Sequence, residues 1–364
     1  MNALSESWKA IDALIPDRDS IVAATAKGLI FGYDRKWAES GWVCEAVEKP
    51  FELPIVNPDS ERSSRTFTQA GKMDKLASYS GKRFLVEHKT TSDDLSDPNG
   101  SYFRRLDIDH QVSQYMLAAW QEGDKLEGTL YDVVRKPGIR PRKITKEEIR
   151  ELNATGLYHG FAVSEGVYEA GHQEDAALYQ RRLSRETIEQ PERYFARKTL
   201  YRIDAQILDF ARELWDTADE IRLARLNNRH YKNPAACVAY GTPCEYLPLC
   251  SGHDTPESDR WVKRESVHEE LELSETGLNV LTHSRIQCFR TCRKKHFYRY
   301  EEGLRRASRE ESDALYFGHV FHHALAAWWS CFLPEGVHAN GNANGSPVNE
   351  AGEHSTASEA HVAR

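Results

Sequence analysis

The chain has 364 residues, of which 40% are hydrophobic and 10% aromatic, and this composition excludes both wholesale disorder and a fibrous repeat. No stretch reaches the ~20 consecutive apolar residues of a membrane span, and the first residues lack a secretory pattern, so we expect a cytoplasmic protein without membrane contact. The formal net charge of -8 argues against a protein that coats nucleic acid through bulk basicity. Seven cysteines are too few for a disulfide scaffold, but three lie close together in the sequence, which indicates metal chemistry in a reducing compartment.

Composition divides the chain into four segments. Residues 1–251 have the character of one continuous folded unit, and 278–333 form a second apolar stretch. Between them, 252–277 hold eight Asp or Glu against three Lys or Arg, which is typical of a solvated acidic linker. Residues 334–364 contain too few large aliphatic side chains to offset the entropy of ordering, so we predict a disordered tail.

Strands and helices alternate along the first unit. The expected elements, in chain order, are a helix at 20–38, a strand at 43–55, strands at 65–77 and 82–91, a helix at 106–121, a strand at 126–136, and helices at 171–192 and 203–228. Pro50 and Pro54 indicate that the first strand lies at a sheet edge or contains a bulge, and Ser80-Gly81 predicts the turn of a β-hairpin. The pattern predicts an α/β fold with a mixed central sheet flanked by helices.

The hairpin carries a carboxylate and an amine that point the same way. Glu87 and Lys89 lie on one face of their strand because side chains alternate with period two. Hairpin pairing can bring Asp74 across from Glu87. Two carboxylates beside a lysine can hold Mg²⁺ or Mn²⁺, which activates water for attack on a phosphoryl group while the lysine orients that water or accepts its proton. The alternative is a surface salt bridge between Glu87 and Lys89, and spacing alone favours it.

The following helix adds a third motif, because Gln111 and Tyr115 lie one turn apart on one face. The order GxxD, ExK and QxxxY resembles the PD-(D/E)XK nuclease superfamily in its RecB-type branch. The resemblance implies a restriction-endonuclease-like core in which Asp74, Glu87 and the carbonyl of His88 bind the metal and Lys89 is catalytic. It also implies that Gln111 and Tyr115 align the lysine and the DNA backbone.

A cysteine cluster forms a second candidate site. Cys237, Cys244 and Cys250 lie in one loop that contains Pro and Gly, and the best candidate for a fourth thiolate is Cys292 in RTCRKKHFYRY. That string resembles the segment that opens the iron-sulfur nucleases of the same superfamily, including AddB-type helicase-nucleases and CRISPR-associated adaptation nucleases. The resemblance implies a [4Fe-4S] cluster. A four-thiolate site also suits Zn²⁺, and free structural cysteines are a third interpretation.

The motifs stand in an unusual order. Residues 278–332 resemble the opening of the same nuclease domain, and GHVFH matches its G-x-x-x-H motif with His322 as the histidine. That opening normally precedes the GxxD hairpin, whereas here it follows the cysteine loop. Either the domain is permuted and 278–332 complete it in cis or in a dimer, so that His322 is a metal ligand, or these residues begin a truncated second copy. We favour the composite domain.

Two basic strings can line a channel that follows phosphates without reading bases. Six Lys or Arg lie in 135–146, and eight lie in 285–306 against two Glu. The candidate nucleic-acid-binding residues are Arg135, Lys136, Arg140, Arg142, Lys143, Arg293, Lys294 and Lys295. A solvated charged face is the ordinary interpretation of such runs.

We therefore expect a metal-dependent DNA nuclease, an exonuclease that processes DNA ends in recombination, repair or phage replication. One alternative is a catalytically incomplete nuclease-fold module that binds DNA or a helicase or recombinase partner. The other is a zinc-stabilised structural protein whose acidic residues are surface charges. The sequence leaves the oligomeric state open.

Overall fold

A computed structural model describes residues 2–17, 19–163, 168–169, 171–239, 241–264, 266, 268, 271, 278–308 and 313–334. The predicted tail, apart from Pro334, lies outside these residues, as does much of the second half of the predicted linker.

The helices are α1 Ala3–Leu14, α2 Ile21–Trp37, α3 Ser101–Arg104, α4 His110–Gln121, α5 Lys146–Thr155, α6 Ala176–Glu189, α7 Pro191–Tyr194, α8 Asp204–Leu226, α9 Leu247–Ser251, α10 His283–Thr291, α11 Arg293–His296 and α12 Asp313–Ser330. The strands are β1 Val43–Val56, β2 Ser63–Tyr79, β3 Lys82–Thr91, β4 Gly128–Arg135, β5 Leu157–Tyr158, β6 Phe161–Ala162, β7 Phe195–Leu200, β8 Val238–Ala239, β9 Thr242–Pro243, β10 Trp261–Lys263, β11 Asn279–Leu281 and β12 Leu304–Arg306.

The central sheet is mixed, as the sequence predicts. Its strand order is β1-β2-β3-β4-β7, and β11 pairs with β2 beyond this path. β3 and β4 are parallel, while β1–β2, β2–β3 and β4–β7 are antiparallel. β1 lies at the edge and its register shifts near Pro54, which accommodates the prolines. Seven of the eight residues of β4 are buried, so helices cover both faces of the sheet at this strand.

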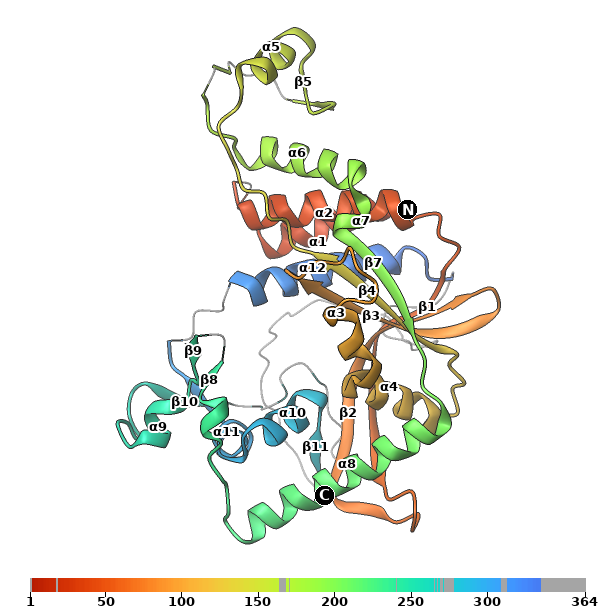
Figure 1. The fold of residues 1–364 in the computed structure, drawn as a ribbon, viewed down its shortest axis with the longest axis vertical. Coiled ribbons are helices and arrows are strands. Elements are labelled where there is room, and N and C mark those ends of the chain that lie inside the picture. Colours follow the sequence, from red (N-terminus) through yellow and green to blue (C-terminus); the bar gives the residue numbers. More distant parts are fainter. Residues whose placement is uncertain are drawn as a thin grey trace, which may run out of the picture.

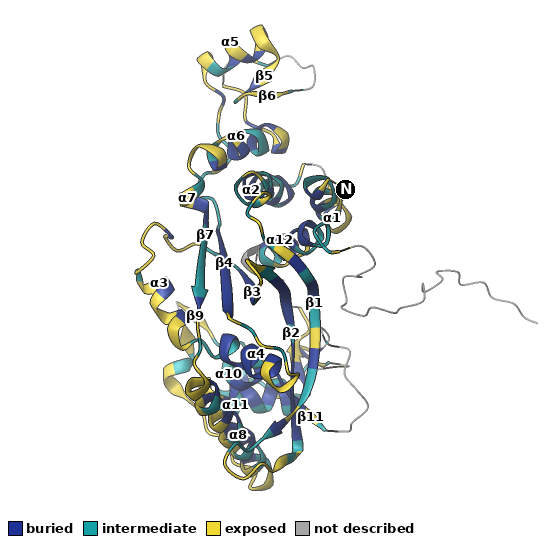
Figure 2. Ribbon diagram, turned by 90° about the vertical axis from the view of Figure 1, so that its right-hand side faces the viewer, coloured by how far each residue is buried: buried dark blue, intermediate teal, exposed yellow. Residues whose placement is uncertain are grey.

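Two hydrophobic clusters hold helices against the sheet (Figures 1 and 2). The first joins α1, α2, α6 and α12 to sheet residues such as Val86 and Leu130. The second joins α4 and α8 to residues such as Phe67 and Tyr131. Helix α12, at the far end of the described chain, thus packs beside α1 at its beginning. Full burial of each large side chain contributes about 1.5–3 kcal/mol, so this packing fixes α12 firmly.

Several elements differ from the prediction. The helix expected over 106–121 begins at His110, because Asp109 caps it by accepting a hydrogen bond from the Val112 amide and a 3₁₀ turn precedes it. Helix α1, the α5–β5–β6 insertion and the short strand β11 were not predicted. Within the predicted linker, β10 pairs with β12 and Trp261 is buried. No helix of the described residues is long and apolar enough to cross a membrane.

Candidate metal centre

Three neighbouring strands bring acidic residues together. Glu48 of β1 lies between the pairs Val47–Lys75 and Lys49–Met73, so it stands opposite Asp74 of β2. The pairs of β2 with β3 run only as far as Lys75–Val86. Beyond that point the Asp74 carboxylate accepts a hydrogen bond from the His88 amide at 2.7 Å, which satisfies a buried donor where the ladder stops. The sheet therefore fixes Asp74 beside the strand that carries Glu87.

Helix α12 adds a histidine to the same place. His322 Nε2 lies 2.8 Å from Glu48 Oε1 and 3.5 Å from Asp74 Oδ1. Ligand atoms of Glu48, Asp74 and His322 lie within 4.8 Å of one another, and this is the one such group among the described residues. A Cβ on Gly318, one turn before His322, would lie 3.5 Å from the Thr90 hydroxyl, so the helix approaches β3 closely. The structure thus brings His322 to the hairpin motifs.

A chain of hydrogen bonds orients the lysine. Lys89 Nζ lies 2.5 Å from Glu87 Oε1 and donates to Gln111 Oε1 at 3.0 Å. The Gln111 amide in turn donates to the Tyr115 hydroxyl at 3.0 Å. A Cβ on Gly71 would come within 2.9 Å of the Phe51 ring and 3.1 Å of the Tyr115 ring, so the glycine is what lets Tyr115 approach β2. The structure therefore joins the ExK and QxxxY motifs into one unit.

Glu48 is the site residue that the sequence analysis missed. Its backbone has φ 54°, an uncommon conformation for a residue other than glycine within a strand. Such strain occurs preferentially at functional sites. Burial by itself would raise the pKa of Glu48, but the hydrogen bonds and charges of His322 and Lys72 outweigh it and lower the pKa to about 2. The available signal was register: the two predicted strands, once paired, place Glu48 opposite Asp74.

The ionisable groups of the site perturb one another. Burial, and secondly the Asp74 carboxylate, raise the pKa of Glu87 to about 7. Burial by itself would lower the pKa of Lys89, but the negative charges of Glu87 and Asp74 outweigh burial, so the pKa of Lys89 is raised. Burial likewise lowers the pKa of His322, while Asp74 and Glu48 more than compensate, so its pKa is raised. The positive charges of Lys72, Lys89 and His322 therefore act directly on the carboxylates of the site.

The donor set fits a divalent cation. The second carboxylate oxygen of Glu87 is buried and has no hydrogen-bond partner. Carboxylates and an imidazole match the preference of Mn²⁺ and Mg²⁺ for oxygen ligands, with the imidazole better suited to Mn²⁺. Glu48, Asp74 and His322 would hold the ion. Glu87 lies outside this group of three, and its role as a ligand remains a prediction.

The His88 side chain is directed away from this donor set. His88 pairs with Asp132 in the β3–β4 ladder, and its Nδ1 lies 3.6 Å from the Asp132 carboxylate. Asp132 also accepts hydrogen bonds from Tyr33 of α2 and from Arg197 of β7. The predicted metal ligand at His88 is its carbonyl, and that assignment remains a prediction.

The four cysteines lie in one neighbourhood. All are free thiols. Burial raises the pKa of Cys250, the charge of Lys232 opposes this, and the thiols of Cys244, Cys292 and Cys237 add to the rise. Cys244 and Cys250 pack against a small aromatic cluster that includes Trp261. Within the described residues, no three of their sulfur atoms approach within 4.8 Å of one another.

Several residues of the basic strings are engaged in ion pairs. Arg135 contacts Asp94 at 3.0 Å, Arg142 contacts Glu148 at 2.5 Å and Arg293 contacts Glu220 at 2.6 Å. Lys136 lies over the Phe317 ring, and Lys294 lies over the rings of Phe297 and Tyr298. For Arg140, Lys143 and Lys295 no salt bridge is found within the described part of the chain. DNA binding by the eight residues remains a prediction.

Comparison with protein families finds one match: the model of the PD-(D/E)XK nuclease superfamily matches residues 280–362. The matched region includes α10, α11, α12 and His322. Comparison with curated proteins and with solved structures gave no significant match. The match indicates nuclease chemistry, which in this superfamily usually depends on a divalent metal ion, and it implies DNA as the substrate. The mixed α/β sheet flanked by helices is consistent with a nuclease-like fold.

Proposed function

We propose that this protein is a metal-dependent deoxyribonuclease that hydrolyses phosphodiester bonds at DNA ends. The observation that carries the proposal is the convergence of His322, from the region that matches the nuclease family, on Glu48 of β1 and Asp74 of the hairpin. Two segments far apart in the sequence supply complementary parts of one donor set. A surface salt bridge does not account for this arrangement, because Glu87 is 1% exposed and Asp74 is 8% exposed.

The site residues have three roles, which are metal binding, orientation of the reacting groups and positioning of Lys89. A bound Mg²⁺ or Mn²⁺ supplies an activated water and neutralises charge on the phosphoryl group. Glu48, Asp74 and His322 would hold the ion, and Glu87 and the carbonyl of His88 are further candidate ligands. Lys89 orients the attacking water or accepts its proton, and the ion pair with Glu87 holds its ammonium group in place. Gln111 and Tyr115 position Lys89.

The composite arrangement supports a RecB-type domain with permuted motifs, completed in cis. His322 meets Glu48 and Asp74 within one chain, and α12 shares a hydrophobic cluster with α1 and α2. If 278–332 were a truncated second copy, its histidine would not be expected to contact the carboxylates of the first copy. We further propose end-dependent action in recombination, repair or phage replication, with a helicase or recombinase as partner.

The cysteine loop is proposed to hold a [4Fe-4S] cluster, with Zn²⁺ as the alternative. Four free thiols are the donor set that both require, and Cys237, Cys244 and Cys292 lie near enough to Cys250 to add to the rise in its pKa. The site joins the loop of 237–250 to Cys292, which begins α11. An ion held there would therefore tie the region matched by the family to the preceding unit. An ultraviolet-visible spectrum of anaerobically purified protein distinguishes the cluster, which absorbs visible light, from zinc, which does not.

The decisive experiment compares degradation of linear and covalently closed circular DNA with Mg²⁺ or Mn²⁺, using the wild type and Lys89→Ala. We expect metal-dependent loss of linear DNA, sparing of the circle, and no loss with Lys89→Ala. Cleavage of both forms would refute end dependence. The absence of cleavage by a folded, metal-loaded wild type would refute the nuclease and favour a module that only binds DNA or a helicase partner.

A further inference from the structure

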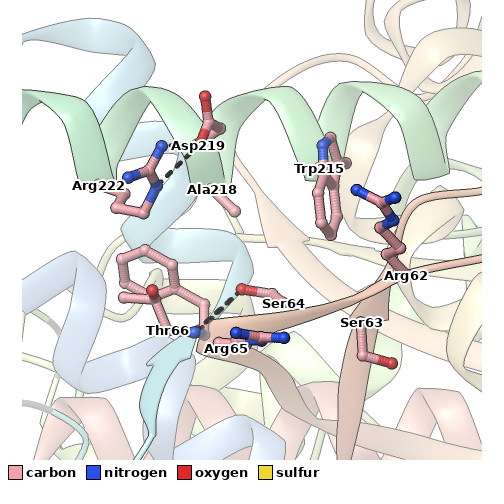
Figure 3. A pocket seen from close by; sticks show the side chains of 10 residues that line it. Arg62, Ser63, Ser64, Arg65, Thr66, Trp215, Ala218, Asp219 and Arg222 are labelled. Atoms are coloured by element: carbon pink, nitrogen blue, oxygen red, sulfur yellow. Dashed lines mark hydrogen bonds and ion pairs between the residues drawn. The ribbon is translucent and has the colours of Figure 1, made fainter. Parts of the chain in front are cut away.

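A cavity with both polar and apolar lining lies away from the metal centre, between α8 and the start of β2 (Figure 3). Its volume is ≈ 1090 Å³, which is enough for a nucleotide with neighbouring phosphates. Its lining includes Arg62, Arg65, Phe67, Trp215, Asp219 and Arg222. Figure 3 shows the Trp215 ring reaching down from α8 beside Arg62, while the serines and Arg65 follow β2.

The charge of this cavity is uncompensated. Arg222 forms an ion pair with Asp219 at 2.7 Å, so these two cancel. Arg62 and Arg65 are both exposed, and in the described part of the chain neither guanidinium has an ion pair or hydrogen bond. Three guanidinium groups against one carboxylate leave a net charge of +2 in a chain whose formal net charge is -8. Unpaired arginines at one cavity are suited to phosphate because the guanidinium matches two phosphate oxygens.

The cavity is also preorganised and offers a stacking surface. The Ser64 hydroxyl accepts hydrogen bonds from the Thr66 and Phe67 amides, which fixes the turn that presents both arginines. Phe67 and Ala218 are buried and form an apolar floor. Trp215 is half-buried and packs against the second hydrophobic cluster, so one part of its ring is held while another faces the cavity. An aromatic ring beside free arginines is the usual platform for an unpaired base.

Strand β2 connects this cavity to the metal centre. Thr66 and Asp74 lie on the same strand, eight residues apart, which is a separation of at most about 27 Å. At the 3.4 Å per nucleotide of a stacked strand, this corresponds to at most about eight nucleotides, and an extended unpaired strand spans it with fewer. Figure 1 shows β2 leading from α8 toward the region where β3 and α12 meet.

We propose that this cavity binds an unpaired DNA strand, with its phosphates on Arg62 and Arg65 and one base stacked on Trp215, at most about eight nucleotides from the bond that is cut. The inference rests on the proposed nuclease function and adds to it a remote subsite that reads strand length. It predicts that substrates long enough to reach both places bind more tightly than short ones.

The binding test uses fluorescein-labelled oligothymidylate of 20 nucleotides in EDTA, so that no cleavage occurs. Arg62→Ala/Arg65→Ala should raise Kd at least about tenfold and reduce the slope of log K against log salt by about 1.4, because each lost contact to a single strand removes ~0.7. The matched control is Arg150→Ala/Arg185→Ala, which removes the same charge from exposed ion pairs on α5 and α6 and should leave the slope unchanged. An unchanged Kd and slope in the Arg62/Arg65 variant would overturn the proposal.

Trp215→Leu tests the stacked base while keeping an apolar side chain against the core. It should weaken binding of the 20-nucleotide strand about tenfold and leave binding of a blunt 20-base-pair duplex unchanged, because a paired base is not free to stack on the ring. Equal weakening on both substrates would refute the stacking role.

Strand length separates this subsite from the metal centre. The Arg62→Ala/Arg65→Ala variant should cleave a 3-nucleotide strand, which is too short to reach both places, at the wild-type rate and a 20-nucleotide strand with reduced kcat/KM. An equal reduction for both lengths would overturn the subsite. If the wild type binds the long strand in an Arg62- and Arg65-dependent way but never cleaves it, the nuclease function is refuted and the subsite is supported. If the wild type cleaves DNA but the variant shows no dependence on strand length, the subsite is refuted and the nuclease function is supported.

Discussion

The metal centre and the cysteine loop are both candidate metal sites, but different forces hold their ligands. At the metal centre, three long strands and α12 fix the side chains, and the polar contacts of Glu48 with His322 and of Asp74 with the His88 amide are 2.8 Å and 2.7 Å long. In the cysteine loop, β8 and β9 have two residues each, and the Cys237 thiol contacts the Asn233 carbonyl four residues earlier in the chain at 3.6 Å. The sheet therefore preorganises the first site, whereas the second would depend on the proposed ion for rigidity.

The largest expected loss of activity comes from removing a carboxylate of the preorganised metal centre. Asp74→Asn should lower the cleavage rate about 10³-fold, because it removes the carboxylate that faces both Glu48 and His322 and weakens metal-dependent stabilisation of the phosphoryl charge. The Asn oxygen can still accept the His88 amide, so the melting temperature should change little. Single-turnover cleavage of linear DNA with Mn²⁺ measures the effect. Cleavage within tenfold of the wild type would remove Asp74 from the site.

The next largest effect concerns resistance to proteolysis, and it tests whether the cysteine loop depends on the proposed ion. Cys250→Ser should abolish the metal content of the loop and increase the rate of protease cleavage within 231–264 about tenfold, because metal binding there is folding energy. Cys331→Ser is the matched control, since that thiol lies at the end of α12 and belongs to no cysteine group. Limited proteolysis with mass spectrometry gives the rates. Equal protection of the two variants would contradict a structural ion in the loop.

A smaller effect tests whether Glu48 is a ligand of the metal centre. Glu48→Gln should raise the Mn²⁺ concentration needed for half-maximal cleavage by roughly 10–100-fold while leaving the rate at saturating metal closer to the wild type, because one ligand charge is lost. Glu45→Gln serves as the control, since Glu45 lies on the same strand but pairs with Arg83 at 2.7 Å. If both variants need the same metal concentration, Glu48 is not a ligand.

A positioning effect should be smaller again. Tyr115→Phe removes the hydroxyl that accepts from Gln111 and so loosens the orientation of Lys89. We expect kcat to fall about tenfold with the metal requirement unchanged, whereas a general packing defect would also lower the melting temperature. Thermal melting and metal titration of the same preparation distinguish the two.

The smallest effect concerns stability against pH and lies outside both sites. Burial lowers the pKa of His296 to about 2, and the positive charge of Arg285 adds to the shift. The folded chain therefore does not take up this proton below pH 6.5, whereas the unfolded chain does, so stability decreases as the pH falls below the unfolded pKa by at most ~1.4 kcal/mol per pH unit. His296→Gln should flatten urea-unfolding stability between pH 6.5 and 5. An unchanged pH dependence would contradict the assignment.

The sequence predicted the parts of the site that lie within one strand or one helix. Glu87 and Lys89 follow from strand alternation, and Gln111 and Tyr115 follow from helical spacing, and the structure places all four in one hydrogen-bonded unit. The mixed sheet followed from the alternation of elements. These features are local, so a single sequence contains them.

Features that depend on register or on distant packing were not predictable in the same way. Glu48 faces Asp74 only because two strands pair in one register, and its positive φ has no signal in the residue type. Helix α1 was missed because its stability comes from packing beside α12, which lies some 300 residues later. The free arginines of the cavity at α8 could be recognised only from the structure, because the sequence does not show which arginines form ion pairs.

The most direct test of the central claim, that hairpin and α12 form one site within one chain, is the cleavage of linear DNA by His322→Ala, by Lys89→Ala and by an equimolar mixture of the two. We predict that each variant cleaves at least about 100-fold more slowly than the wild type and that the mixture recovers no activity, because His322 and Lys89 act in the same chain. Recovery of activity in the mixture would show that α12 completes a partner chain, and wild-type cleavage by His322→Ala would contradict the composite site altogether.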